Sequence, residues 1–308
     1  MSEYALEING LKKVYDNDVE ALKGIDLKIT KGDFFALLGP NGAGKSSTIG
    51  IISSITNKSA GNIKIFGVDI DKNFPKAKSY LGVVAQEVNF SQFEKVEDIV
   101  ITQAGFYGIP KEVAKERCKN LLEKLSLWGK RHDQARNLSG GQKRRLMIAK
   151  ALVHEPKLLI LDEPTAGVDI ELRREMWDFL SSINKKGTTI ILTTHYLEEA
   201  EQHCNNIAII DEGTIVENTS MKELLSRLSI QSFVLDLDNE IHELPDLPIF
   251  DLKSQDSKTL IATLTKDDDL NTLFKNLSDH GIKVKSMRNE QNRLEELFIK
   301  LVKEKDGD

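Results

Sequence analysis

A glycine-rich run follows the apolar residues Phe34 to Leu38. Two glycines separated by four residues, then a lysine and a hydroxyl side chain, form the pattern of a phosphate-binding loop. Glycine lets the backbone curl so that several N–H groups point at phosphate oxygens, and a following helix adds the positive end of its dipole. A turn ending in a solvated lysine is the alternative, and the preceding apolar strand argues against it. The run comprises Gly39, Pro40, Asn41, Gly42, Ala43, Gly44, Lys45 and Ser46.

Charged and hydroxyl side chains near such a loop could bind a nucleotide and its metal ion. Lys45 is expected to bridge the β- and γ-phosphates, and Ser46 to bind Mg²⁺, a hard ion that prefers oxygen ligands. Asp162 and Glu163 end a second apolar run. Adjacent acids at the carboxyl end of a strand lie on the rim where ligands bind in open α/β sheets. Without the glycine loop, a solvated acidic turn would be the favoured interpretation of these two acids.

Two further polar side chains follow strand-like segments. Gln86 comes directly after Gly82 to Ala85, and its amide can both coordinate a metal ion and orient a water molecule. His195 comes 32 residues after Glu163, at the end of a third apolar run, where its imidazole could contact the γ-phosphate. The alternatives are an exposed polar glutamine and a strand-end histidine bonded to backbone. The order of these residues along the chain favours the functional interpretation.

A second candidate anion site lies between the glycine loop and the acidic pair. It precedes a helix-like stretch and begins with a serine, a good N-cap residue, followed by glycines that let a ligand approach the backbone closely. The glycine loop already supplies one complete cradle for the same phosphates. A second cradle is redundant unless it serves another molecule. The residues are Leu138, Ser139, Gly140, Gly141 and Gln142, which spell LSGGQ.

The order of glycine loop, LSGGQ and acidic strand resembles that of the ABC-type ATPases, and the sequence is identified as a member of that family. The resemblance covers about Leu6 to Leu228. It implies ATP and Mg²⁺ as ligands and a head-to-tail homodimer, with each ATP held between the glycine loop of one protomer and the LSGGQ of the other. Asp169 matches the loop that crosses the dimer interface, although Ala166-Gly-Val here replaces the Ser-Ala-Leu of many members.

The resemblance also implies roles for single residues around the phosphates. Glu163 would act as general base for the attacking water, and Asp162 would hold Mg²⁺ through water. Gln86 would coordinate the metal, and His195 would contact the γ-phosphate.

Other implied roles lie away from the reacting phosphate. Tyr15 matches the aromatic residue on which such proteins stack adenine, and Ser47 would join the loop in binding ATP. The segment from Gln86 to Phe93 would contact a membrane partner.

Over its whole length the chain resembles the ATP-binding subunit of a bacterial ABC-2-type exporter, through Ala166 to Arg174, Thr193 to Ala200 and Arg293 to Lys300. This implies export of an unidentified substrate through a separate transmembrane permease, which would hold the chain on the cytoplasmic face of the membrane. The alternative is a soluble ABC ATPase acting on nucleic acid or ribosomes. Such proteins commonly insert coiled coils or zinc modules, or carry two nucleotide domains, whereas this chain has one glycine loop and one LSGGQ.

Composition agrees with a cytoplasmic α/β protein. The 308 residues, 40% of them hydrophobic, can form one large and one small domain. A formal net charge of -6 argues weakly against a dedicated nucleic-acid surface. Cys118 and Cys204 are too few for a disulfide framework and lack metal-ligand spacing. No secretory signal and no apolar run of membrane-spanning length is expected in this sequence.

The hydrophobic pattern predicts an ABC ATPase core of the P-loop NTPase class, an α/β fold over residues 1–228. Alternation in Leu6 to Ile8 and Leu27 to Ile29, broken by Asn9-Gly10, predicts short strands and turns in an antiparallel β subdomain. Continuous apolar runs predict three buried strands of a mostly parallel sheet. A helical pattern over about residues 96–151 predicts an inserted helical subdomain.

Residues 229–308 are expected to form a small C-terminal α+β appendage of unknown role. Its pattern predicts the order ββαβα, with strands near Phe233 and Leu260, a helix from Leu270 and a strand from Ile282. The two prolines of the segment Glu243 to Pro248 predict a loop. An amphipathic stretch from Leu294 to Val302 predicts a final helix that packs on the appendage or on another protomer.

Overall fold

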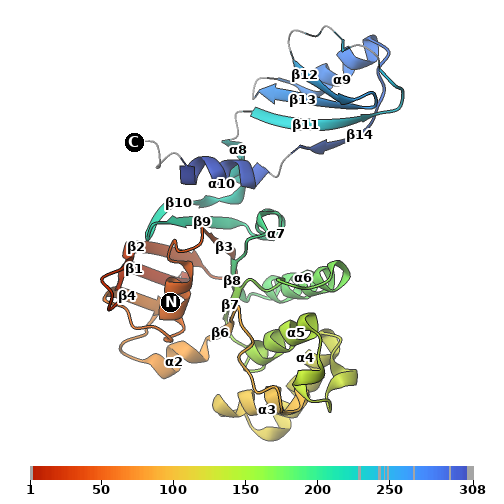
Figure 1. The fold of residues 1–308 in the computed structure, drawn as a ribbon. Coiled ribbons are helices and arrows are strands. Elements are labelled where there is room, and N and C mark those ends of the chain that lie inside the picture. The colour runs from red at the N-terminus through yellow and green to blue at the C-terminus, as the bar shows by residue number, and fades with distance from the viewer. Residues whose placement is uncertain are drawn as a thin grey trace. The chain divides into compact units, whose positions relative to one another are not determined.

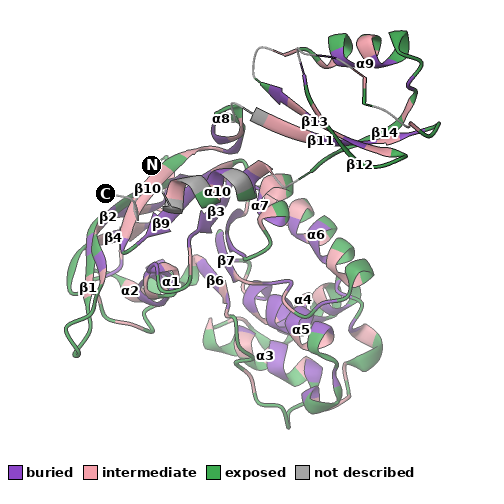
Figure 2. Cartoon of the chain, turned by 45° about the horizontal axis from the view of Figure 1, so that its top comes forward, coloured by how far each residue is buried: buried purple, intermediate pink, exposed green. Residues whose placement is uncertain are grey.

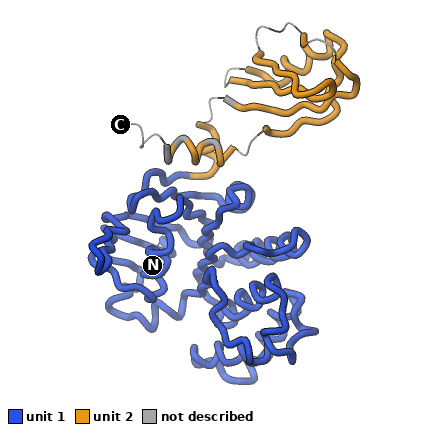
Figure 3. Tube along the Cα trace, viewed as in Figure 1, with its two compact units in different colours: residues 1–219 blue, residues 220–308 orange. Residues whose placement is uncertain are grey.

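The computed structural model describes residues 3–227, 230–241, 244–245, 247, 250–265, 268–290 and 293–303. The chain divides into two compact units, Met1–Thr219 and Ser220–Asp308 (Figure 3). The first unit contains all of the motif residues. The second has a sheet and a hydrophobic core of its own.

A six-stranded sheet organises the first unit (Figure 1). Its strands are β3 (Phe34–Leu38), β6 (Leu81–Val84), β7 (Leu158–Asp162), β8 (Thr189–Thr193), β9 (Asn206–Asp211) and β10 (Thr214–Ser220). They lie in the order β10-β9-β3-β8-β7-β6, and the pairings β3 with β8 and β9, and β7 with β6 and β8, are parallel. The apolar runs correspond to β3, β7 and β8, which are buried on both faces, so the predicted parallel core is confirmed (Figure 2).

A four-stranded sheet, with antiparallel neighbours, opens the chain. Its strands are β1 (Tyr4–Val14), β2 (Glu20–Thr30), β4 (Ala60–Ile65) and β5 (Val68–Asp69), in the order β2-β1-β4-β5. The turn predicted at Asn9-Gly10 is wrong, because β1 continues through it. The register of β1 against β2 shifts between Ile8 and Leu11, and Gly10 has a φ of 55°, which glycine adopts without steric cost. The apparent turn signal is therefore a β-bulge in one long strand.

Helix α1 (Lys45–Ile52) packs against both sheets of the first unit. Its side chains Ile49, Ile51 and Ile52 join one core cluster with Ile63 of β4 and Leu37 of β3. Each buried isoleucine stabilises this arrangement by roughly 1.5–3 kcal/mol. The start of α1, where the glycine loop leads in, is therefore held firmly. The other helices outside the helical subdomain are α2 (Phe74–Ser79), α6 (Ile170–Lys185) and α7 (Leu197–His203).

The helical subdomain lies between β6 and β7 in the sequence. It consists of α3 (Val96–Phe106), α4 (Lys111–Lys124) and α5 (Gly140–Leu152), with short 3₁₀ turns η1 (Trp128–Lys130) and η2 (Ala135–Asn137) before α5. All three helices contact one another. Backbone hydrogen bonds from Ala135 to Glu94 and from Arg136 to Gln92 bind the segment ahead of α5 to the segment ahead of α3. The loop that follows Gln86 is thus tied to the residues that precede LSGGQ.

The second unit contains a four-stranded antiparallel sheet with helices. Its elements are α8 (Met221–Ser226), β11 (Ile230–Leu237), β12 (Asp251–Asp256), β13 (Thr259–Thr265), α9 (Leu270–Asp279), β14 (Val284–Asn289) and α10 (Arg293–Lys303), with strand order β12-β13-β11-β14. The pattern missed β12, an edge strand whose side chains are mostly polar and exposed, so no apolar alternation marks it. Part of the predicted loop, including Glu243 and Pro248, lies outside the described residues.

Two leucines of α9 close the core of the second unit. Leu273 and Leu277 are fully buried and pack in one cluster with Leu235 of β11 and Leu260 of β13. Helix α10 buries Leu294 and contacts α8, which belongs to the same unit but precedes the residues expected to form the appendage.

Candidate functional site

The glycine loop connects β3 to α1 through backbone conformations that favour glycine. Gly42 has a φ of 82° and Gly44, the N-cap of α1, has a φ of 114°. A side chain at Gly39 would place its Cβ 2.1 Å from the carbonyl oxygen of Ile210, so this position admits only glycine. Gly42 meets no atom within 4 Å, and Asn41 is exposed beside it, whereas Ala43 is buried. The loop is therefore fixed at both ends and open in the middle.

We expect Gly44→Ala to disrupt this loop. Its Cβ would lie 2.7 Å from Leu22 Cδ2 and 2.9 Å from the Ala21 carbonyl oxygen, at a φ that alanine rarely adopts. Backbone strain of this kind costs about 1–3 kcal/mol. Thermal unfolding and ATP titration of the variant should show a lower Tm and weaker binding. In the control Gly105→Ala, the new methyl lies in open space on α3, so an unchanged or higher Tm is expected there, and equal losses in both variants would contradict the argument.

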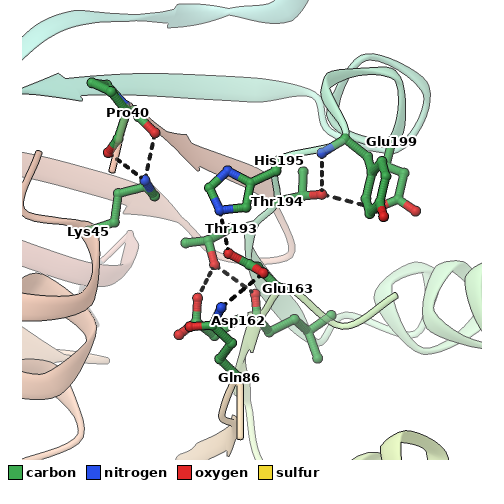
Figure 4. Close-up of polar contacts among 12 residues, drawn as sticks. Pro40, Lys45, Gln86, Asp162, Glu163, Thr193, Thr194, His195 and Glu199 are labelled. Atoms are coloured by element: carbon green, nitrogen blue, oxygen red, sulfur yellow. Dashed lines mark hydrogen bonds and ion pairs between the residues drawn. The ribbon is translucent and has the colours of Figure 1, made fainter. Parts of the chain in front are cut away.

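Lys45, the first residue of α1, turns back over the loop. Its Nζ donates hydrogen bonds to the carbonyl oxygens of Gly39 at 2.6 Å and Pro40 at 2.8 Å (Figure 4). Burial lowers the pKa of the Lys45 ammonium, and the carboxylates of Glu163 and Asp162 act in the opposite direction. The cation thus lies in the field of the acidic pair. A phosphate bound at this loop would compete with the carbonyl oxygens of Gly39 and Pro40 for the Lys45 ammonium.

The acidic pair forms a hydrogen-bonded cluster with residues from two neighbouring strands (Figure 4). His195 Nε2 lies 2.6 Å from Glu163 Oε1, and Gln86 Nε2 donates to Glu163 Oε2 at 3.1 Å. The hydroxyl of Thr193 donates to the carboxylate of Asp162. The structure therefore brings together Gln86, the adjacent pair Asp162 and Glu163, and His195, which come from three separate segments of the sequence. Both oxygens of Glu163 have a partner on another strand end.

The backbone at Glu163 is unusual. Its φ is 49°, a left-handed conformation that non-glycine residues adopt rarely, and its N–H donates to the Thr193 carbonyl oxygen at 3.0 Å. Such conformations are concentrated at functional sites, where surrounding contacts hold them. The turn at Glu163 directs its side chain to His195 and Gln86.

Three side chains that the sequence analysis did not select also shape the cluster. Thr193 orients Asp162, a role that its place in the exporter-like segment Thr193 to Ala200 did not indicate. Arg144 of α5 donates to the carbonyl oxygens of Ala85 at 2.7 Å and Gln86 at 2.8 Å. Lys150, further along α5, donates to the Asn89 carbonyl oxygen at 2.7 Å. A basic residue on a helix usually indicates a solvated face, so the sequence carried no signal for these contacts.

Tyr15 lies beside the start of α1. Its hydroxyl is 3.0 Å from the hydroxyl of Ser47, and its ring is partly exposed. The Nζ of Lys13 lies 4.6 Å from the ring centroid. An aromatic surface and a cation therefore adjoin the glycine loop, next to Ser46 and Ser47.

LSGGQ forms the capped start of α5. The hydroxyl of Ser139 accepts a hydrogen bond from the Gln142 backbone N–H at 3.3 Å, and the Gln142 side chain accepts one from the Ser139 N–H at 3.0 Å. This capping box orders the helix end whose positive dipole points outward. Cβ atoms at Gly140 would meet nothing within 4 Å, and those at Gly141 only ordinary contacts. Within the described part of the chain, no hydrogen bond or ion pair joins LSGGQ to the glycine loop.

The segment after the acidic pair leads into α6. Asp169 is the N-cap residue of α6 but makes no side-chain cap bond, and Gly167 has a φ of 70°. Ile170 beside it is 86% exposed, a large apolar side chain left in water. Among the described residues, no three or more His, Cys, Asp or Glu side chains form a group that could hold a metal ion.

A phosphate-binding loop, an acidic strand end and a second capped helix start on a mostly parallel sheet define a P-loop ATPase. A family model described as ABC transporter matches residues 22–166. The chain is 34% identical over 304 residues to the linearmycin resistance ATP-binding protein LnrL of Bacillus subtilis, covering 96% of this chain and 97% of that protein.

Two other similar proteins are also parts of transport systems. The Nod factor export ATP-binding protein I of Cupriavidus metallidurans is 38% identical over 221 residues, which is 71% of this chain and 72% of that one. The solved structure of cbiO1 from Clostridium perfringens, part of the ABC transporter complex cbiONQ, aligns with a TM-score of 0.66 and 32% identity over 73% of this chain and 92% of that chain. The chain belongs to the ABC transporter family and is an ATP-binding, ATP-hydrolysing subunit.

Membership in this family favours transport over the nucleic-acid or ribosome alternative. Among the helices that the structure describes, none is long and apolar enough to cross a membrane.

Proposed function

We propose that two copies of the chain bind two ATP molecules between them and drive export of a substrate through a separate transmembrane permease. One observation supports the dimer above all: the capped helix start at Ser139, a candidate anion site, shares no hydrogen bond or ion pair with the glycine loop among the described residues. The exposed Ile170 beside Asp169 supports a surface that a second copy covers. ATP between the copies would hold them together, and hydrolysis would release them.

Within each site, we assign the phosphates to the glycine loop and Lys45. Tyr15 would stack on adenine, and Ser47 would hold the hydroxyl of that tyrosine in place. Glu163 would take the proton of the attacking water, and His195 would contact the γ-phosphate. Each oxygen of Glu163 has one partner and can accept a second hydrogen bond, so a water molecule can donate to Glu163 while Gln86 and His195 hold the carboxylate in place.

The donor set near the acidic pair fits Mg²⁺. Ser46 is exposed and offers a hydroxyl, Asp162 offers a carboxylate, and Gln86 uses its nitrogen on Glu163, which leaves its amide oxygen for a metal. All three are hard oxygen donors of the kind that Mg²⁺ prefers, with Asp162 acting through water. When bound, the ion would neutralise charge on the β- and γ-phosphates. Thr193 would keep the Asp162 carboxylate oriented toward it.

The names of the relatives support export as the direction of transport. LnrL is named for linearmycin resistance and the Cupriavidus protein for Nod factor export. The match to LnrL extends over 96% of this chain and so includes most of the second unit. We therefore propose an exporter of the ABC-2 type, held on the cytoplasmic face of the membrane by its permease.

The permease would dock on the helical subdomain. Phe93, which ends the segment that starts at Gln86, is 71% exposed, and Phe106, the last residue of α3, is 80% exposed. Large exposed aromatic side chains are typical of surfaces that another protein covers. Arg144 and Lys150 connect the same segment to α5. A displacement of this segment by the permease would therefore move both Gln86 and LSGGQ.

We expect the double variant Phe93→Ser, Phe106→Ser to lose the permease. Hot-spot aromatic residues contribute about 2 kcal/mol or more each, which is about 30-fold in affinity for one residue and about 10³-fold for two that act independently. The amount of permease that co-purifies with a tagged chain should fall accordingly. The basal ATPase of the purified chain should persist. Ile55→Ser is the matched control, because Ile55 is 79% exposed but lies after α1, outside the helical subdomain. Wild-type recovery of permease with the double variant would refute the docking surface.

A further inference from the structure

Glu199 is a buried acid that the proposed mechanism does not use. It lies in the first turn of α7, and only 6% of its surface is exposed. A buried carboxylate costs free energy unless donors surround it, and this one is surrounded. Figure 4 shows it beside Thr194, near the cluster around Glu163 and His195.

Three hydrogen-bond donors and one guanidinium, from three parts of the chain, approach its two oxygens. The hydroxyls of Thr165 at 2.8 Å and Thr194 at 3.1 Å both donate to Oε2. Trp177 Nε1 donates to Oε1 at 3.3 Å, and Arg173 Nε lies 3.7 Å from the same oxygen. A carboxylate accepts only, so its acceptor capacity matches this set of donors.

The partners of Glu199 are close in sequence to the proposed catalytic residues. Thr165 follows Glu163 by one intervening proline, and Thr194 directly precedes His195. The Thr194 hydroxyl also accepts a hydrogen bond from the Tyr196 N–H at 2.9 Å, so it holds the backbone on the far side of the histidine. One oxygen atom, Oε2 of Glu199, thus connects the turn that carries the base to the turn that carries the histidine.

Arg173 extends the connection to the loop that contains Asp169. Its guanidinium donates to the Val168 carbonyl oxygen at 3.5 Å and lies 4.7 Å from the centroid of the Tyr196 ring. The same side chain therefore contacts the loop ahead of Asp169, the carboxylate of Glu199 and the residue after His195. In the proposed dimer, a displacement of the Asp169 loop would reach Glu199 through this arginine.

We propose that Glu199 is a positioning residue, which fixes the turn at Glu163 relative to the turn at His195 and couples both to the Asp169 loop. This inference rests on the proposed roles of Glu163 and His195. Glu163 has a left-handed backbone and meets His195 Nε2 at 2.6 Å, so a small shift between the two turns would break their contact. A misplacement of about 1 Å in such a site can lower the rate about 100-fold.

The test compares single-donor deletions in the full-length chain. Thr165→Val and Thr194→Val each remove one hydroxyl and keep the side-chain shape, and Glu199→Gln keeps the size but turns an N–H group toward donors. We expect each to lower kcat about 10- to 100-fold, as loss of a supporting contact does in other sites, with the KM for ATP changed less than about two-fold. Since both threonines bind one oxygen, the double variant should be far less impaired than additivity predicts.

Trp177→Phe is the matched control. It removes a donor from the same carboxylate, but Trp177 belongs to α6 and to neither turn, and it packs against His203 and Phe34. This variant should lower Tm while kcat, measured at a temperature where every variant is folded, stays within about two-fold of wild type.

Two outcomes would overturn the inference. If the threonine variants lower Tm but leave kcat unchanged, Glu199 supports the fold alone. If Trp177→Phe lowers kcat as much as they do, the loss is general and not transmitted through the two turns. Glu163→Gln, assayed in parallel, separates this from the proposed function: its normal turnover would refute the assigned base, whereas its inactivity beside normal threonine variants refutes only the role of Glu199.

Discussion

Glu163→Gln is expected to slow ATP hydrolysis by about 10² to 10⁴ and to leave an ATP-bound dimer that no longer separates. The substitution removes the base while keeping the shape of the side chain. A glutamine can accept a hydrogen bond from the Gln86 N–H with its oxygen and donate one to His195 Nε2 with its nitrogen. The contacts that Glu163 makes with Gln86 at 3.1 Å and with His195 at 2.6 Å can therefore persist. Steady-state phosphate release measures the first effect, and size-exclusion chromatography with and without ATP measures the second.

Glu155→Gln provides the control. Glu155 also has a left-handed backbone, with φ 55° against 49° for Glu163, and it also has an ion-pair partner, Arg117. It lies before β7, however, at the opposite end of the strand that carries the acidic pair. Its substitution should change turnover less than two-fold. Normal hydrolysis by Glu163→Gln, or a variant that elutes as a monomer with ATP, would contradict the assignment.

The residues that we propose to contact phosphate leave a pattern in the sequence because their chemistry constrains short stretches of the chain. Gly39 and Gly44 must be glycine for steric reasons visible in the structure, and Ser139 must cap a helix. Each requirement acts over a few neighbouring positions, so it leaves a local pattern. The buried strands were predictable for a related reason, since burial on both faces of a parallel sheet requires continuous apolar runs.

Contacts between distant segments left no such pattern. Arg144 donates to carbonyl oxygens some 58 positions away, and a backbone carbonyl places no demand on residue type. Glu199 resembles any acid in the first turn of a helix, a position where acids are common because of the dipole. Only the folded chain shows that Thr165 and Thr194 meet at one of its oxygens.

Two predictions about strands failed, the turn at Asn9-Gly10 and the missing strand β12, and in both cases the position of the strand in its sheet decides the structure. Asn9-Gly10 favours a turn locally, yet pairing of β1 with both β2 and β4 continues past it, so the sheet overrides the local preference. Strand β12 is polar because its position at the sheet edge exposes it.

A mixture of two inactive variants is expected to recover ATPase activity. Lys45→Ala removes the cation at the phosphates and Gly140→Asp places a carboxylate at the start of α5, so each alone should lose at least about 100-fold in turnover. In a mixed dimer, one site combines both defects, and the other combines an intact glycine loop with an intact LSGGQ. With random pairing, half of the dimers would carry one working site of two, so an equal mixture should reach at least about a quarter of wild-type activity, and more if the two variants pair preferentially.

Gly140→Asp is suited to this test because it should not harm the fold. A Cβ at Gly140 meets nothing within 4 Å, and an acid in the first turn of a helix is favoured by the dipole. Ser139 is less suitable, because its hydroxyl also caps α5, so that its loss would destabilise the helix. An unchanged Tm for Gly140→Asp would show that the variant loses activity because its carboxylate repels the phosphate of ATP, and not because the fold is less stable.

The matched control places both substitutions in one chain and mixes it with wild type. If each ATP is held by two protomers, every mixed dimer then has one defect in each of its sites, so the double variant should inhibit wild-type activity as it is added. If one protomer held a whole site, the wild-type partner would keep its activity, and the two single variants would restore nothing on mixing. Tagged copies captured with ATP add a second measure, since Lys45→Ala and Gly140→Asp should pair with each other more readily than either pairs with itself.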